Sequence, residues 1–228
     1  MHLGLNKTTQ FYLRPQKFIL DSLIFSNTKK ATISLLLLIL SSSFLGQSNL
    51  LAPISIDFFS TNYPNYEFES FIYVGIKRQK LYVFKQQDII ACFPISSSKR
   101  GVGNTINSFK TPTGLHKINT KYGYDVPFGG IFEHRKFKGK IATICHDTIS
   151  TGKDIICSRI LRLEGLERGI NKDGIVDSYN RKIYIHGTNE EGLIGTKASH
   201  GCIRMKNKDI IDLYNMTAKG MLVIIIDN

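Results

Sequence analysis

Several patterns that often reveal a protein's function are missing from this sequence. The four cysteines, Cys92, Cys145, Cys157 and Cys202, never form a C-x-x-C pair, which argues against a zinc ribbon and against a redox dithiol. No repeat of about 20 to 50 residues occurs, which argues against a solenoid or a propeller. Acidic residues are few: 18 stand against 30 basic ones, so the net charge is +12. This balance favours an anionic partner, which could be nucleic acid, acidic lipid or an anionic cell-wall polymer.

The sequence does contain enough apolar side chain for a folded body. Of the 228 residues, 42% are hydrophobic and 21% are charged, so a packed core is expected and general disorder is not. The length leaves room for one full domain with a short extension, or for two very small domains. A large multidomain protein is excluded.

The first 46 residues have the order of a secretory signal: basic residues, then an apolar run, then small residues. Lys29 and Lys30 close the basic part, and the uncharged, mostly apolar run covers about 15 residues, 31–45. That length suits a signal better than the ~20 residues that span a bilayer. We expect export, with segment 1–46 as a cleaved signal or an N-terminal anchor; a buried hydrophobic helix is the alternative. Residues 47–69 show no steady period and are interpreted as a linker.

The rest of the chain, 70–228, is predicted to be one domain made mostly of strands. Its strand candidates are short, rich in β-branched and aromatic residues, and bounded by polar turns. The first two flank a polar turn and so predict a β-hairpin. The expected strands are 71–76, 80–85, 89–95, 114–118, 141–144, 182–186 and 221–226. The lysine-rich segment 135–140 is interpreted as a solvated face.

One segment, 208–219, has the pattern of a helix. Asn207 precedes it as the expected N-cap, Asp209 in the first turn suits the helix dipole, and Gly220 follows its end. We expect this helix to pack against the sheet through its apolar positions, which are Ile210, Leu213, Tyr214 and Thr217.

Residues with catalytic potential gather in two segments. His186 closes an apolar run in Ile185-His186-Gly187-Thr188, and Cys202 stands in Ser199-His200-Gly201-Cys202-Ile203-Arg204. A cysteine attacks as a thiolate, and a histidine on another segment can be the base that it needs. Gly201 would let the backbone approach a substrate, and the N–H groups around it could stabilise an oxyanion. Arg204 could bind a substrate carboxylate through two hydrogen bonds.

Other interpretations of the same residues remain open. Cys202 could be a small buried apolar residue, with the histidines in capping or core positions and Arg204 on the surface. His186, His200 and Cys202 could instead bind zinc if Cys145 or His146 supplied a fourth ligand. Cys145 and Cys157 enclose a short loop and could form a disulfide, which the sequence alone does not decide.

The two segments, together with Lys110-Thr111-Pro112-Thr113-Gly114, resemble the catalytic domain of the L,D-transpeptidases, the YkuD-like family. The motifs are His186-Gly187-Thr188 and Ser199-His200-Gly201-Cys202-Ile203-Arg204-Met205, and the resemblance covers about 71–227. It implies a mainly β fold, a β-sandwich of the L,D-transpeptidase type with few short helices. That expectation agrees with the strand pattern.

The resemblance also implies roles for individual residues. Cys202 would be the nucleophile and His186 the general base, with the carbonyl of Gly187 holding the imidazole in the useful tautomer. The oxyanion site would be lined by Ser199, His200 and Gly201, and the substrate would be contacted by Thr188 and Arg204. No metal and no cofactor is expected.

The implied reaction is acyl transfer on peptidoglycan stem peptides through a thioester. Cys202 would attack the carbonyl of the third residue of a tetrapeptide and release the terminal D-alanine. The acceptor could be an amine of a second stem, a lysine of a lipoprotein, or water, which would make the enzyme an L,D-carboxypeptidase. A non-catalytic wall-binding module is the alternative from another class. We expect the protein in the periplasm or cell envelope, without nucleic acid as a partner and with a membrane only through the N-terminal segment.

Overall fold

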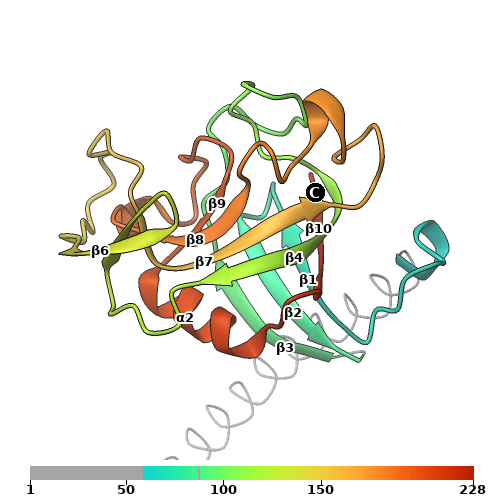
Figure 1. Ribbon diagram of the computed structural model, residues 1–228, viewed down its shortest axis with the longest axis horizontal. Coiled ribbons are helices and arrows are strands. Elements are labelled where there is room, and N and C mark those ends of the chain that lie inside the picture. The colour runs from blue at the N-terminus through green and yellow to red at the C-terminus, as the bar shows by residue number, and fades with distance from the viewer. Residues whose placement is uncertain (1–58, 87) are drawn as a thin grey trace, which may run out of the picture. The chain divides into compact units, whose positions relative to one another are not determined.

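Ten strands form the body of the computed structural model, which describes residues 59–86 and 88–228 (Figure 1). They are accompanied by helix α2 (Asn207–Met216), by a helical turn at 59–62, and by two 3-10 helices, Gly174–Val176 and Glu191–Leu193. The strands are β1 (Ser70–Gly75), β2 (Lys80–Lys85), β3 (Asp88–Pro94), β4 (Gly114–Tyr122), β5 (Gly130–Glu133), β6 (Lys136–Ile141), β7 (Ile156–Gly165), β8 (Tyr184–Thr188), β9 (Ile203–Met205) and β10 (Leu222–Ile226). The expectation of a mainly β fold with few short helices is confirmed.

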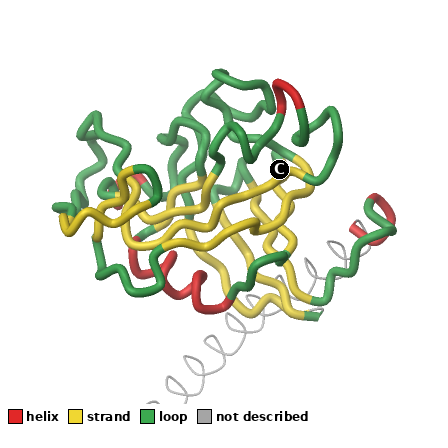
Figure 2. Tube along the Cα trace, viewed as in Figure 1, coloured by secondary structure: helices red, strands yellow, loops and turns green. Residues whose placement is uncertain are grey.

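All ten strands belong to one hydrogen-bonded sheet. Its order is β3-β2-β1-β10-β4-β7-β5-β6, and β7 also pairs with β8, which pairs with β9. β1 and β10 run parallel, as do β8 and β9, and the other neighbours are antiparallel. Just after β3, Ser96 bridges to Arg204 of β9, so the sheet curls back on itself. Figure 2 shows the strands at the centre, with most loops on one side and α2 on the other.

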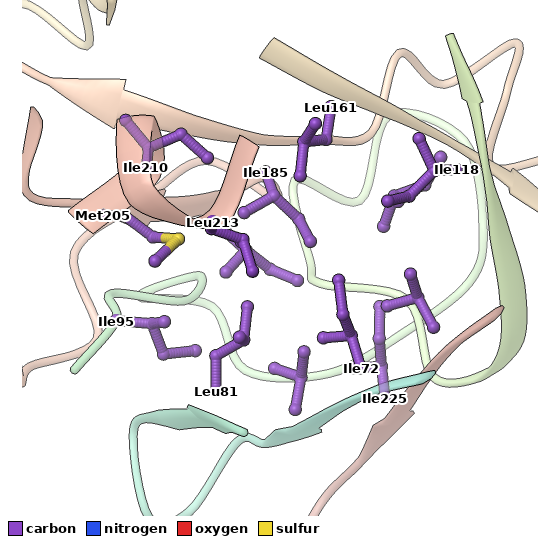
Figure 3. Close-up of a cluster of buried hydrophobic side chains, with 14 of the residues drawn as sticks. Ile72, Leu81, Ile95, Ile118, Leu161, Ile185, Met205, Ile210, Leu213 and Ile225 are labelled. Atoms are coloured by element: carbon purple, nitrogen blue, oxygen red, sulfur yellow. The ribbon is translucent and has the colours of Figure 1, made fainter. Parts of the chain in front are cut away.

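The curled sheet encloses an aliphatic core against which α2 packs (Figure 3). Alternate residues of each strand, such as Ile72 and Val74 of β1, point into this core because successive side chains of a strand face opposite ways. Other members are Leu81, Ile95, Ile118, Leu161, Ile185, Met205, Ile210, Leu213 and Ile225. The core therefore fixes β8 and β9, the two strands that adjoin the predicted catalytic segments.

The predicted helix is present, but it is shorter and begins differently. The N-cap position belongs to Lys206, and Asn207 lies inside α2 with a buried side chain. The Asn207 amide donates to the carbonyl of Thr188 (2.8 Å), and its oxygen accepts from the hydroxyl of Ser158 (2.7 Å). The N-cap prediction was wrong because this side chain satisfies buried groups of β7 and β8 instead. The predicted apolar side is confirmed by the burial of Ile210, Leu213 and Tyr214.

The strand prediction fails around β6 and β7. Segment 141–144 lies mostly outside strands, and the lysine-rich segment before it forms β6, because pairing with β5 stabilises a strand that its composition disfavours. The longest strand, β7, is absent from the prediction, since Arg159 and Arg162 interrupt its apolar pattern. Both arginines are buried and donate from their Nη atoms to backbone carbonyls, which reduces the cost of burying them, although the Nε atom of each has no hydrogen-bond partner.

β6 forms one end of the sheet within the described residues. Lys136, Lys138 and Lys140 alternate along it and are exposed, whereas Phe137 turns inward against a small apolar cluster. This arrangement agrees with the solvated face predicted for 135–140.

The segment before β1 belongs to the folded body. Residues 59–62 are helical, and Phe59 and Phe68 pack edge-on against Phe71 of β1. Phe59 is only 1% exposed. Because aromatic side chains bury large apolar areas, this packing anchors the segment to the sheet. The predicted linker therefore needs correction over 59–69.

The predicted leader, 1–46, lies outside the described residues. Within 59–86 and 88–228, no helix combines the length and the apolar character needed to cross a membrane. All four cysteines are free thiols, so Cys145 and Cys157 do not form the disulfide that their spacing allows.

Candidate active site

His186 lies in β8 with its side chain turned away from the aliphatic core. It is 1% exposed, and its Nδ1 donates to the carbonyl of Gly187 (2.8 Å). This hydrogen bond leaves Nε2 as the ring nitrogen with a free lone pair. Burial lowers the pKa of His186, although the charge of Asp154 opposes that effect. At neutral pH the imidazole is therefore uncharged and able to accept a proton.

Cys202 lies directly before β9, the parallel neighbour of β8. Because Ile203 pairs with Ile185, the preceding Cys202 lies beside the start of the strand that carries His186. Its thiol is within 3.5 Å of the Lys182 carbonyl. Burial raises the pKa of the Cys202 thiol to about 12, although the backbone N–H of Tyr184 opposes that shift. The resting cysteine is therefore a thiol.

The histidine and the cysteine, on neighbouring strands, are thus both uncharged at rest. A thiol is a weak nucleophile, and an uncharged imidazole nearby can remove its proton as the sulfur attacks. The arrangement favours proton transfer during attack over a preformed thiolate and imidazolium. It can perform base-assisted nucleophilic chemistry on a carbonyl.

The loop before Cys202 is braced by Ser199. The Ser199 hydroxyl donates to the carbonyl of Cys202 (2.6 Å) and accepts from the N–H of Gly201 (3.2 Å). Gly201 has a φ of +125°, and a Cβ there would stand 3.3 Å from the carbonyl of Lys110. The conformation and the close approach both favour glycine. Ser199 is fully buried, so its hydroxyl shapes the loop instead of facing a substrate.

Arg204 and Thr188 do not lie where the sequence predicts them. Arg204 is 1% exposed, and its guanidinium contacts Asp154 (Nε–Oδ1, 2.7 Å) and Glu190 (Nη1–Oε2, 2.9 Å). Thr188 is fully buried, and its hydroxyl accepts from the N–H of Glu190 (3.1 Å). Each residue has partners inside the protein that no spacing rule revealed, and neither side chain is exposed to contact a substrate in this structure.

His200 is the member of the predicted oxyanion group that reaches solvent. Its side chain is 46% exposed, and its Nδ1 lies 2.9 Å from Oδ2 of Asp154. Asp154 therefore contacts both His200 and Arg204, although it stands in a loop far from them in sequence. Neither Asp154 nor Glu190 belongs to a motif that sequence analysis could have singled out.

A cleft of about 330 Å³ opens at Cys202 and His200. Ile106 and Phe109 form part of one wall, and Arg181 and Lys182 form part of another. Pocket walls of this mixed character suit a ligand with both apolar and charged groups.

Arg181 fixes the shape of this cleft. Its guanidinium donates to the carbonyls of Lys110 (2.6 Å), Asn104 (2.8 Å) and Gly103 (3.2 Å). These bonds tie the 103–110 loop to the segment before β8. Arg181 is also close enough to Cys202 for its charge to lower the pKa of that thiol, against the larger effect of burial.

The histidines and Cys202 do not form a metal site. In the part of the chain that the structure describes, no group of three or more His, Cys, Asp or Glu side chains is placed to hold a metal ion. His186 and His200 direct Nδ1 to Gly187 and Asp154, respectively.

Comparison with known sequences gives one family. A sequence model of the L,D-transpeptidase catalytic domain (YkuD) matches residues 69–225. YkuD of Bacillus subtilis (strain 168) is 51% identical over 41 residues, 18% of this chain and 25% of that protein. YbiS of Escherichia coli (strain K12) is 41% identical over 58 residues, 25% of this chain and 19% of that protein. Both carry names of the L,D-transpeptidase class, and the matches span a quarter or less of each relative's length.

Two of the solved structures that the chain matches are L,D-transpeptidases. The L,D-transpeptidase from Mycobacterium smegmatis has a TM-score of 0.42 and 16% identity, over 69% of this chain and 58% of that chain. L,D-transpeptidase 3 from Mycobacterium tuberculosis, in complex with a faropenem-derived adduct, has a TM-score of 0.43 and 15% identity, over 69% of this chain and 60% of that chain.

Proposed function

Because the chain belongs to the L,D-transpeptidase catalytic domain family, we propose that it is an acyltransferase that uses Cys202 as its nucleophile and peptidoglycan stem peptides as its substrates. One observation carries the assignment to these residues: Cys202 opens into a cleft and lies beside the strand of His186, whose imidazole is fixed by the carbonyl of Gly187. The pair has the protonation states that base-assisted attack requires.

The first half-reaction forms a thioester. As Cys202 Sγ attacks the carbonyl carbon of the third stem residue, Nε2 of His186 takes the thiol proton. The tetrahedral intermediate collapses when the bond to the terminal D-alanine breaks, and the imidazolium gives its proton to the leaving amine. In the second half-reaction an acceptor amine attacks the thioester, His186 takes a proton from it, and that proton returns to the sulfur of Cys202.

Backbone N–H groups of 200–202 are proposed to stabilise the oxyanion of both intermediates. The N–H of Gly201 already donates to Ser199, so we assign the larger contribution to the N–H groups of His200 and Cys202. Ser199 supports this geometry indirectly by bracing the loop.

Lys182 replaces Arg204 as the proposed contact for a substrate carboxylate. It is exposed, it lines the cleft, and its carbonyl lies next to the thiol of Cys202. We expect Lys182→Gln to raise KM for a tetrapeptide donor about tenfold with little change in kcat, since a charge-assisted hydrogen bond contributes about 1.5–3 kcal/mol. Steady-state kinetics beside Lys219→Gln, an exposed lysine that does not line this cleft, measures the effect; equal KM values for the two variants would contradict it.

The assignment is tested by incubating the full 228-residue chain with purified disaccharide tetrapeptide. Mass spectrometry would follow both the products and the intact protein. We expect a cross-linked dimer lighter by one D-alanine and a transient adduct on Cys202. Cys202→Ala should lose both the adduct and turnover, whereas Cys92→Ala, which removes an exposed thiol of β3, should keep both.

Other outcomes separate the alternatives. Tripeptide without dimer would identify an L,D-carboxypeptidase, and transfer to an added protein lysine would identify attachment of a lipoprotein to the wall. Absence of both product and adduct would favour the non-catalytic wall-binding module. Full turnover by Cys202→Ala would end the assignment of the nucleophile.

We also propose that the protein is exported, because its substrate lies in the cell envelope and its first 46 residues have the order of a secretory signal. Cleavage of this leader and its retention as an anchor are distinguished by the N-terminal sequence of the protein recovered from the envelope.

A further inference from the structure

A buried cluster of charges lies behind the Cys202 loop, and the mechanism above does not use it. Its centre is Arg204, which contacts Asp154 through Nε (2.7 Å) and Glu190 through Nη1 (2.9 Å). The second oxygen of Asp154 lies 2.9 Å from Nδ1 of His200. The cluster therefore joins the loop before β7 to β9 and to the loop that carries Cys202.

The register of β8 and β9 places the cluster beside His186. Ile185 and Ile203 form one pair of this ladder, and both face the aliphatic core. The next pair, His186 and Arg204, therefore lies on the opposite face, because successive side chains alternate. Asp154 contacts Arg204 on that face. The carboxylate therefore lies on the same face of the sheet as His186, near enough for its charge to raise the pKa of that residue.

The cluster holds one negative charge in excess, because two carboxylates share one guanidinium. Burial raises the pKa of Asp154, but its contacts with Arg204 and His200 outweigh burial and lower the pKa overall. Burial likewise raises the pKa of Glu190, and hydrogen bonds from Thr151 outweigh it. Both carboxylates are therefore ionised at neutral pH.

We propose that Asp154 is a positioning residue whose charge, aimed by Arg204 and His200, is the counter-charge for the imidazolium that forms on His186 during acyl transfer. The inference rests on the proposed function. In the resting state His186 is uncharged, and Arg204 is the only cation paired with the two carboxylates among the described residues. When His186 takes the proton of Cys202, the positive charge appears beside a carboxylate that is already in place. Electrostatic groups fixed before the reaction need no reorganisation during it.

The same charge acts in the opposite sense on the cysteine. Asp154 raises the pKa of Cys202, adding to the larger effect of burial. A counter-charge at this position therefore favours a protonated histidine and disfavours a free thiolate. A residue that only holds the loop in place would not affect the two groups in this coupled way.

A test of Asp154 must leave the other titratable and charged side chains around it unsubstituted. On the active-site side, Asp154 is faced by four groups: Arg204, His186, Cys202 and the half-exposed His200. The remaining charged neighbours line a cavity with Asp154 on its other side: Lys140, Lys153 and Glu133.

The test is Asp154→Asn in the full 228-residue chain, which removes the charge and keeps the size. Asp147→Asn, an exposed position in the same loop, is the matched control. Two pH profiles are measured: kcat/KM with the disaccharide tetrapeptide, and alkylation of Cys202 by iodoacetamide, followed at the Cys202 peptide by mass spectrometry. The second profile needs no peptidoglycan substrate, so it distinguishes a failure of this inference from a failure of the proposed function.

We expect Asp154→Asn to lower kcat/KM about tenfold at neutral pH and to move its acidic limb to lower pH, because the imidazolium loses its counter-charge. The alkylation limb should also move to lower pH, because the thiolate loses a repulsive neighbour. Asp154→Glu should restore both limbs towards their original positions. Asp147→Asn should leave both profiles unchanged.

Reduced activity of a folded Asp154→Asn protein with both limbs unmoved would overturn the inference in favour of a structural role. A shifted alkylation limb in a chain that never turns over tetrapeptide would support the counter-charge while refuting the proposed function. If Asp154→Asn does not fold, Asp154→Ser, which also removes the charge, takes its place: limbs displaced to lower pH would support the proposal, and unmoved limbs would overturn it.

Discussion

Replacing His186 with alanine should slow formation of the Cys202 thioester by about 10²–10⁴-fold, the usual contribution of a general base. The resting thiol has a pKa of about 12, so without a base almost none of it is thiolate at neutral pH. The rate is measured by mixing protein with tetrapeptide, quenching, and quantifying the Cys202 adduct by mass spectrometry. His134→Asn is the matched control, because His134 is exposed and has a φ of +51°, which asparagine tolerates.

The pH profile gives the same prediction a second check. Burial lowers the pKa of His186 below its ordinary value of 6.5, and a base is active when it is deprotonated. The acidic limb of kcat/KM should therefore lie below pH 6.5, with activity retained through neutral pH. An acidic limb above pH 7, or an unchanged acylation rate in His186→Ala, would be incompatible with an uncharged His186 as the base.

Replacing Arg204 with methionine should lower the free energy of unfolding by about 3–5 kcal/mol, because it leaves Asp154 and Glu190 as buried carboxylates without their shared cation. Methionine retains much of the side-chain length, so the loss reports the charge more than the volume. Chemical denaturation of the full chain measures it. Arg168→Met, at a side chain that is 86% exposed, should change the stability by less than about 0.5 kcal/mol.

The direction in which the stability loss of Arg204→Met changes with pH distinguishes a buried ion-pair role for Arg204 from a role on the protein surface. The pKa values of Asp154 and Glu190 are lowered in the folded protein, so the stability that their ion pairs with Arg204 contribute is present at neutral pH. It is lost as the pH falls through the pKa values that the two carboxylates have in the folded protein. Without Arg204 the two carboxylates should become protonated at a higher pH. The difference in free energy of unfolding between Arg204→Met and the parent protein should therefore become smaller as the pH is lowered. A variant with normal stability and only a raised KM would instead restore Arg204 as a substrate ligand.

Local sequence patterns predicted the parts of the molecule that depend on nearby residues. Strands such as β1 and β2 bury an unbroken run of β-branched, aromatic and other apolar side chains, and that run, bounded by polar residues, is visible in the sequence. The proximity of His186 and Cys202 could also be anticipated, because both stand at the ends of apolar segments with short polar loops between them. Their chemical roles remain a proposal that the experiments above test.

The parts that escaped prediction depend on partners distant in the chain. The sequence pattern of an arginine two residues after a cysteine is the same whether the arginine faces solvent or two carboxylates. Only the fold brings Asp154 and Glu190 to Arg204. Arg181 escaped notice for the same reason, since its backbone acceptors lie in another loop. Phe59 and Phe68 likewise gain their meaning only from the outer face of the sheet that they cover.

The lysines of β6 also bear on how copies of this protein behave towards one another. A strand at the end of a sheet has unpaired backbone groups that invite pairing with a second chain. Along β6, Lys136, Lys138 and Lys140 put a positive charge at every second residue. Two such edges laid side by side would bring like charges together at each step, and that repulsion protects the sheet against edge-to-edge aggregation.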